Sequence, residues 1–315
     1  MIKRWTAMKW GAIALGVWAT LGTAAIFSGV ARAADGTVEI KNAWNEGRYS
    51  ALQETSVSYV EQNGREVLAR AQTRATFSWQ VESEALRADG VRVLKLKAER
   101  VMIRLQSDGA DIAYYDSDNP LRGDELMKDV FAKLMKSEFV VELKDGKVIK
   151  VEGCDEFAKT LPVGESESEK YFVEHIKTTV ATPGNIAQIF DPIAYPLPRK
   201  PVAVGDRWTT ETPFALPVIG EKKLVLDCEL KTLKRAEPKA NVAAEAVLDV
   251  DLTAGASATI KIDIDGKYNL TDGVADDFTS RATVNIELPR KDKTGAEIVV
   301  KAIGVIRNKL TVVKR

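Results

Sequence analysis

The amino-acid sequence predicts a mainly β (β-rich α+β) protein, with long antiparallel strands in a strongly curved sheet or an open half-barrel. Three observations support this fold class. Apolar and polar residues alternate with a period of two, Gly-containing pairs link the alternating runs, and the few helical patterns cluster mid-chain. One apolar and one polar face per strand is typical of an antiparallel sheet. We expect about a dozen strands, with two or three helices packed on the concave side.

The chain opens on a predicted secretory signal peptide, residues 1–33. Basic residues precede an uncharged apolar run, Trp10–Val30, which closes on the small residues of Ala31-Arg32-Ala33. The run could also cross a bilayer, which needs about 20 residues, so a retained anchor is the alternative. Its moderate hydrophobicity and the adjacent cleavage site favour cutting after Ala33. The residue after the cut is Ala34, and no Cys lies near it to carry a lipid. We expect a protein of the periplasm or extracellular space, soluble after cleavage.

The first half of the mature chain contains long strand patterns joined by turn residues. Asn63-Gly64, Asp89-Gly90 and Asp145-Gly146 separate them, as expected of hairpin turns. The alternation of apolar and polar residues shifts by one position near Arg100, which indicates a β-bulge. The predicted strands are 48–61, 65–82, 91–107, 138–144 and 147–152.

Three helices are predicted between these strands and the middle of the chain. Residues 121–136 carry an apolar stripe at helical spacing. A short helix is expected at 153–161. A third begins at Ser166, with Glu169 three residues later as a capping box.

A proline-rich strap, residues 183–217, is predicted to join two halves of one β-rich domain (34–315), namely 34–182 and 200–315. Seven of the eleven prolines fall in it, too many for a helix or a central strand. Its large apolar side chains favour an ordered strap over a disordered linker. Alternation resumes after it, and the last segment, 296–313, is partly apolar on both faces, which favours a central position.

Composition excludes some classes of function. The mature part has 41 basic and 45 acidic residues, a net charge of −4. This balance argues against nucleic-acid binding, which requires a basic face, and against electrostatic docking on anionic lipid. Cys154 and Cys228 are expected to be separate thiols; a disulfide between them is the alternative in an oxidising compartment.

No catalytic or metal-binding motif emerges. The single histidine, His175, lies on a predicted helix without a nucleophile motif elsewhere. The segment Asp116–Asn119 offers oxygen ligands, but Pro and Leu follow where a calcium loop needs Asp or Asn and Gly. The pairs Asp249/Asp251 and Asp263/Asp265 have the pattern of a solvent-facing strand surface. We expect no catalytic residues, no metal and no cofactor, and a non-enzymatic protein.

The predicted helices offer the best candidates for a ligand site. Met127, Phe131 and Met135 share a stripe of the first helix, and Phe172 and Ile176 face inward from the third. Methionine adapts to varied apolar ligands, so these five side chains are candidates to line an apolar cavity. Plain core packing is the alternative explanation.

Several short segments occur in a familiar order. These are Tyr115–Pro120, the pair Phe139–Leu143 and Asp145–Gly153, then Pro201–Trp208, and later Gly266–Tyr268 with Asp272-Gly273. In this order the chain resembles a family of uncharacterised exported bacterial proteins of about 300 residues, a domain of unknown function. The resemblance implies bacterial export and no assigned site. The architecture is more distantly similar to periplasmic lipoprotein-carrier proteins, an analogy of fold alone.

Three functions remain open from the sequence. The first is an exported, non-enzymatic envelope protein that binds an apolar or lipidic ligand or a protein partner. The second is a structural or assembly component of the envelope. The third is a hydrolase with an unrecognised carboxylate site. The oligomeric state is not indicated by any pattern.

Overall fold

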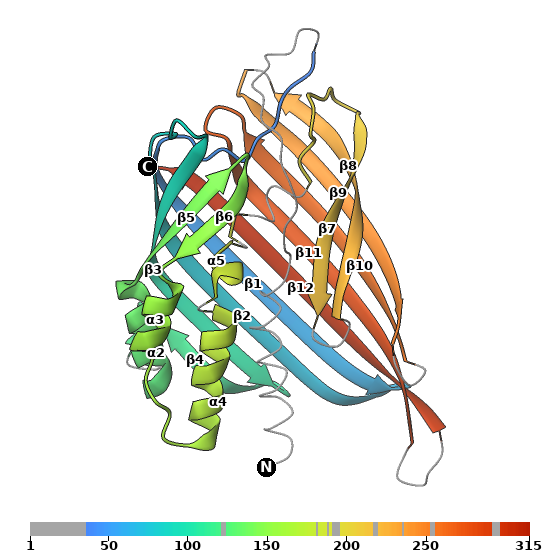
Figure 1. Cartoon of the computed structure of the whole chain (residues 1–315). Coiled ribbons are helices and arrows are strands. Elements are labelled where there is room, and N and C mark those ends of the chain that lie inside the picture. The colour runs from blue at the N-terminus through green and yellow to red at the C-terminus, as the bar shows by residue number, and fades with distance from the viewer. Residues whose placement is uncertain are drawn as a thin grey trace.

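The computed structural model describes residues 36–120, 124–180, 182–187, 189–190, 196–216, 220–234, 236–252, 256–291 and 297–315. The predicted signal peptide, residues 1–33, lies outside this part. The described residues form one antiparallel sheet of twelve strands (Figure 1). The strands are β1 (Gly47–Asn63), β2 (Glu66–Ser83), β3 (Val91–Ser107), β4 (Ala110–Asp116), β5 (Glu138–Lys144), β6 (Lys147–Glu152), β7 (Arg207–Leu216), β8 (Gly220–Lys234), β9 (Lys239–Asp251), β10 (Ser257–Asn269), β11 (Val274–Lys291) and β12 (Glu297–Lys314).

The sheet is open. Its order is β6-β5-β3-β2-β1-β12-β11-β10-β9-β8-β7, with β4 paired to β3 beside β5. The two end strands, β6 and β7, do not pair with each other within the described residues. The predicted mainly β class, the antiparallel pairing and the absence of closure are confirmed.

The predicted strong curvature is wrong. The sheet twists without bending sharply (Figure 1), as wide open sheets do. Sharp curvature needs bulges or glycine kinks in the middle of strands. Most register shifts in the described strands lie near strand ends, such as the one between Glu61 and Gln62.

The predicted hairpins and bulge are confirmed. The turn between β5 and β6 consists of Asp145 and Gly146, with φ angles of 52° and 77°. Two positive φ angles produce the tight turn that matches strand twist. Ser78 of β2 lies opposite Arg100 and Trp79 lies opposite Ala98, so β3 has an extra residue, the predicted bulge.

The helices are α2 (Glu125–Lys136), α3 (Cys154–Thr160), α4 (Glu167–His175) and α5 (Pro183–Ala187), with a π-helical turn, η2 (Ile176–Val180). The three predicted helices are therefore confirmed. The first begins later than expected because Asp124 caps it, its side chain accepting hydrogen bonds from two backbone N–H groups of the first turn. The capping box of Ser166 and Glu169 is present as predicted.

The predicted strap is only partly irregular. It contains α5 near its start, and strand β7 occupies most of its last part. Pro213 fits in β7 because β7 is an end strand, where a missing N–H costs no pairing on the outer side. Val202 forms an isolated antiparallel bridge with Val38. The two predicted halves meet in the same sheet, because β12 pairs along β1 from Tyr49 to Asn63.

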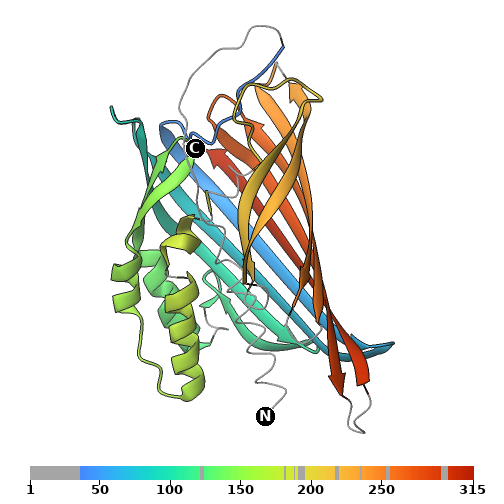
Figure 2. The same cartoon turned by 45° about the vertical axis from the view of Figure 1, so that its right-hand side comes forward.

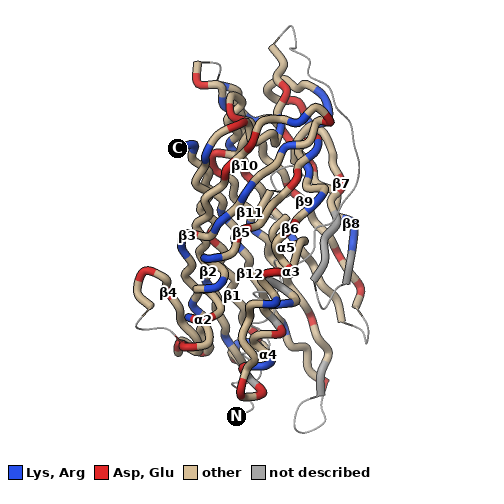
Figure 3. Tube along the Cα trace, turned by 60° about the vertical axis from the view of Figure 1, so that its left-hand side comes forward, with Lys and Arg blue, Asp and Glu red and all other residues tan. Residues whose placement is uncertain are grey.

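The helices lie on one face of the sheet, next to β3 and β6 (Figures 1 and 2). We call this face the inner face and the opposite one the outer face. Buried side chains alternate along the strands with exposed ones, as the period of two requires. Basic and acidic residues are interspersed along the strands and loops in Figure 3, in line with the small net charge.

Candidate functional site

The five predicted cavity residues lie together in one packed region. Met127 and Phe131 of α2 and Ile176 of η2 have 3%, 0% and 0% of their surface exposed. Met135 and Phe172 are partly buried against the same apolar cluster. The structure thus brings these residues together, as the sequence predicted. Their lining of a ligand cavity stays a prediction.

Aromatic rings fill the space around these residues. The ring of Phe131 stacks on Tyr115, with centroids 5.2 Å apart, and Phe139 lies edge-on to Phe157 at 6.1 Å. We call this the first apolar cluster; its largest fully buried side chains include Trp44, Tyr49, Phe131, Phe139, Phe157 and Phe190. It joins the helices to β1–β5 and also includes residues at one end of β8–β12. Burial raises the pKa of the Tyr115 hydroxyl.

A second apolar cluster lies on the inner face over other parts of β1 and β8–β12. Its buried members come from β1 and β8–β12, and its side chains are mostly small or aliphatic. They are Tyr59, Leu224, Leu226, Cys228, Ala244, Ala246, Val250, Ala258, Ile260, Ile262, Val284, Ile286 and Ala302. Partly buried Ala71 and Ala282 adjoin it, and so does Trp208. No described helix makes its main contacts with these strands; α2 packs on β3 and α5 on β6.

A row of polar side chains crosses the inner face between the two clusters. The Thr55 hydroxyl donates to Asn308 Oδ1 at 3.0 Å, and Asn308 Nδ2 donates to Ser280 Oγ at 3.3 Å. We call these three residues the polar seam. Thr55 is 6% exposed, whereas Asn308 is exposed, so solvent reaches the inner face there. Amphiphiles match an apolar surface that ends on a wet polar rim.

The two cysteines are separate, buried thiols, as predicted. Cys154 belongs to the first apolar cluster and Cys228 to the second. Burial raises the pKa of each thiol to about 12. Neither is a reactive nucleophile at neutral pH, because the thiolate is the reactive form.

The weaker sequence candidates have structural explanations. Asp116 ends β4, and Arg100 contacts both Asp116 and Asp118, at 3.6 and 2.7 Å. Asp249 accepts a hydrogen bond from Thr259 at 2.7 Å on the outer face. His175 is the last residue of α4. Across the described residues no group of three or more His, Cys, Asp or Glu side chains is placed to hold a metal ion.

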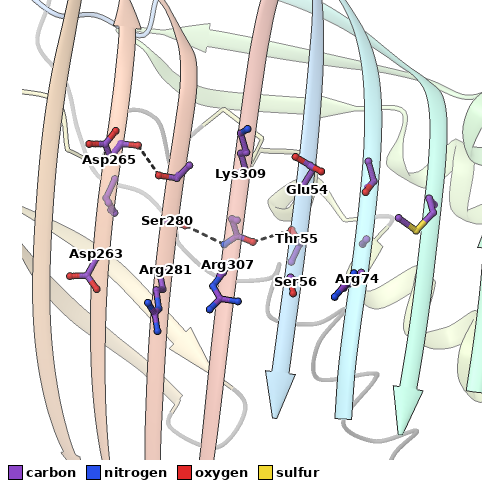
Figure 4. Close-up of a pocket in the computed structure, with 16 residues that line it drawn as sticks. Glu54, Thr55, Ser56, Arg74, Asp263, Asp265, Ser280, Arg281, Arg307 and Lys309 are labelled. Carbon is purple, nitrogen blue, oxygen red and sulfur yellow. Dashed lines mark hydrogen bonds between the residues drawn. The ribbon is translucent and has the colours of Figure 1, made fainter. Parts of the chain in front are cut away.

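The outer face has a shallow groove of about 620 Å³ that runs across the strands (Figure 4). Two rows of outward side chains form its sides, and the residues between them, such as Thr55 and Ser280, form its floor. The lower row in Figure 4 is Asp263, Arg281, Arg307, Ser56 and Arg74, from β10, β11, β12, β1 and β2. The upper row is Asp265, Thr279, Lys309, Glu54, Thr76 and Met102.

None of the five predicted cavity residues lines this groove. Sequence reasoning placed Asp263 and Asp265 on a solvent face but did not detect the groove. The residues of each row lie up to about 250 positions apart, and only the strand register brings them together. No local pattern in the sequence predicts that register.

A family model described as a family of unknown function, DUF6263, matches residues 89–274. The match covers more than half of the chain. The chain belongs to the DUF6263 family. The predicted resemblance to a family without an assigned function is thereby confirmed, and the matched segment runs from the β2–β3 link through β10. No match was found among curated proteins.

Among solved structures, the chain shows a distant similarity to a lipovitellin described in terms of lipid–protein interactions. The identity is 11% and the TM-score 0.39, over 86% of this chain and 25% of the other; the DUF6263 chain spans about a quarter of its length. OccK5 (OpdH) of Pseudomonas aeruginosa gives 4% identity and a TM-score of 0.22, covering 86% and 99% of the two chains. The COG4313 outer membrane channel of Pseudomonas putida F1 has 10% sequence identity and a TM-score of 0.18, over 90% of this chain and 100% of the channel.

These three similarities are too weak to carry an argument about function. In the part of the chain that the structure describes, no helix is long and apolar enough to cross a membrane.

Proposed function

We propose that this DUF6263 protein is exported to the bacterial envelope and binds an apolar or lipidic ligand on the inner face of its sheet. The observation that carries the proposal is the contrast between the two apolar clusters. Aromatic rings fill the first, where the helices pack, whereas alanines recur throughout the second. Small side chains project only a short distance from the sheet, so an acyl chain can lie close to the strands.

The polar seam supports an amphiphilic ligand. It borders the second cluster and is open to solvent at Asn308. A ligand with its apolar part over Ile262 and Val284 would have its polar end near Ser280 and Asn308. Ile264, next to the seam on the same face of β10, contacts both clusters. The proposed orientation therefore leaves no buried polar group of the ligand without a partner.

Native mass spectrometry of the protein purified from its own envelope tests the proposal. We expect a mass above that of the polypeptide, with a lipid released on activation. Ala282, which is partly buried beside the second cluster, is the position to block. The Ala282→Phe variant should lose most of the bound ligand, because the ring would project onto the inner face where the ligand is proposed to lie.

Thr283→Phe is the matched control, since the neighbouring side chain points to the outer face of the same strand β11. This variant should keep its ligand. A bare polypeptide that also takes up no fatty acid or phospholipid on incubation would refute lipid binding. Equal ligand loss in both variants would place the ligand elsewhere.

The proposed export has a separate test. N-terminal sequencing of the protein recovered from the envelope should begin at Ala34, after the predicted cut. Recovery in the membrane fraction with residue 1 or 2 at the N-terminus would support the retained anchor instead.

A further inference from the structure

We propose that the groove on the outer face binds a phosphate-bearing ligand through Arg281, Arg307 and Arg74. This site lies on the opposite face from the proposed apolar site, and neither proposal depends on the other. Three features of the groove support phosphate binding. The arginines are adjacent, they have no partners among the described residues, and their spacing suits phosphate oxygens.

The arginines are neighbours by strand register. Arg281 of β11 lies directly opposite Arg307 of β12, and Arg307 lies directly opposite Ser56 of β1. Ser56 in turn lies opposite Arg74 of β2. Figure 4 shows the three arginines at one level of the groove. Like charges directly opposite each other destabilise an antiparallel pair, so this arrangement costs stability without an anion.

The three guanidinium groups are not neutralised within the described residues. Arg281, Arg307 and Arg74 form no ion pair or hydrogen bond there, and Lys309 in the upper row forms none either. Asp263, which lies opposite Arg281, contacts Lys261 at 3.4 Å instead.

The arginine beside Arg74 on the next strand provides a contrast. Arg104 of β3 lies opposite Arg74 and forms two hydrogen bonds to Asp111, at 2.8 and 3.1 Å. Lys301 on the same face likewise contacts Glu287 at 2.9 Å. The three groove arginines differ from these two residues because no described carboxylate neutralises them.

The groove is not uniformly basic. Glu54, Asp263 and Asp265 also line it, against four basic residues. The two aspartates lie at the β10 end, and Glu54 lies in the upper row opposite Lys309. The anion is therefore expected over β11, β12, β1 and β2, where the lower row has three arginines and one serine.

The spacing suits phosphate. Neighbouring strands lie about 4.8 Å apart, so Arg281 and Arg307 reach the same anion, and Arg74 lies about 10 Å from Arg307. A guanidinium group can donate two parallel N–H hydrogen bonds to phosphate oxygens. The Ser56 hydroxyl adds a donor between Arg307 and Arg74. A phosphate ester or diester fits this row. It could come from a soluble phosphorylated molecule or from a phospholipid headgroup.

Calorimetric titration of the full-length protein with inorganic phosphate and with glycerol phosphate tests whether the ligand is a soluble phosphorylated molecule. Co-sedimentation with phosphatidylglycerol vesicles, against phosphatidylcholine vesicles, tests the headgroup. We expect binding in at least one arm, weakened at least tenfold by Arg307→Gln and by Arg281→Gln and reduced by added salt. Phosphate binding assigns a soluble ligand; binding to phosphatidylglycerol vesicles alone assigns the headgroup.

Arg104→Gln is the matched control, because Arg104 lies opposite Arg74 but outside the groove and already has a partner. The affinity of this variant should stay within twofold of the unmodified protein. Without anion, Arg307→Gln should raise the melting temperature, since it removes the repulsion from Arg281. Absence of binding in both arms would overturn the proposal, and so would equal weakening by Arg104→Gln and Arg307→Gln.

Discussion

Replacing Phe131 by alanine tests whether the helices are fixed to the sheet by a packed core. The ring is fully buried and stacks on Tyr115, with centroids 5.2 Å apart. Lost burial costs about 2–3 kcal/mol and the lost ring pair about 1 kcal/mol. A remaining void of about 40 Å³ adds about 1 kcal/mol. The free energy of unfolding should therefore fall by about 4 kcal/mol, within the usual range of about 3–5 kcal/mol for this substitution.

Urea denaturation followed by far-UV circular dichroism measures this change. Phe131→Leu keeps most of the volume and should cost about 1 kcal/mol. Val163→Ala, at an 88% exposed position before α4, should change stability by less than about 0.5 kcal/mol. A loss below about 1.5 kcal/mol for Phe131→Ala, with loss of a bound apolar ligand, would refute the packed core. It would favour the cavity that the sequence predicted at this place.

Two further substitutions or treatments probe particular contacts. Gly153→Ala should destabilise the protein by about 2 kcal/mol or more in the same assay. The backbone of Gly153 has a φ of 93°, and a Cβ there would lie 2.4 Å from the carbonyl oxygen of Glu138. Gly184→Ala, with nothing within 4 Å, should not destabilise; equal losses would contradict this reasoning. Cys154 and Cys228 should resist iodoacetamide at pH 8, because a pKa of about 12 leaves about one thiol in ten thousand ionised. Both should react in urea, and rapid labelling of the folded protein would show that the thiols are accessible.

The sequence alone determined the local structure. The alternation of apolar residues, the Asp145-Gly146 turn, the bulge near Arg100 and the capping box at Ser166 all depend on contacts within a few residues. Such features are set by backbone sterics and by hydrogen bonds to near neighbours. They can therefore be predicted from the sequence without knowledge of the strand pairing. The same holds for the buried stripe that Phe131 occupies on α2.

Only the tertiary structure decided how these elements combine. The pairing of β1 with β12 joins positions about 250 residues apart, and it brings Ser56 beside Arg307. The twist of the sheet and the division of its inner face into an aromatic and an alanine-rich cluster also follow from strand order. A periodic pattern states which face of a strand is apolar but not which strand lies beside it, because pairing depends on burial summed over the whole sheet.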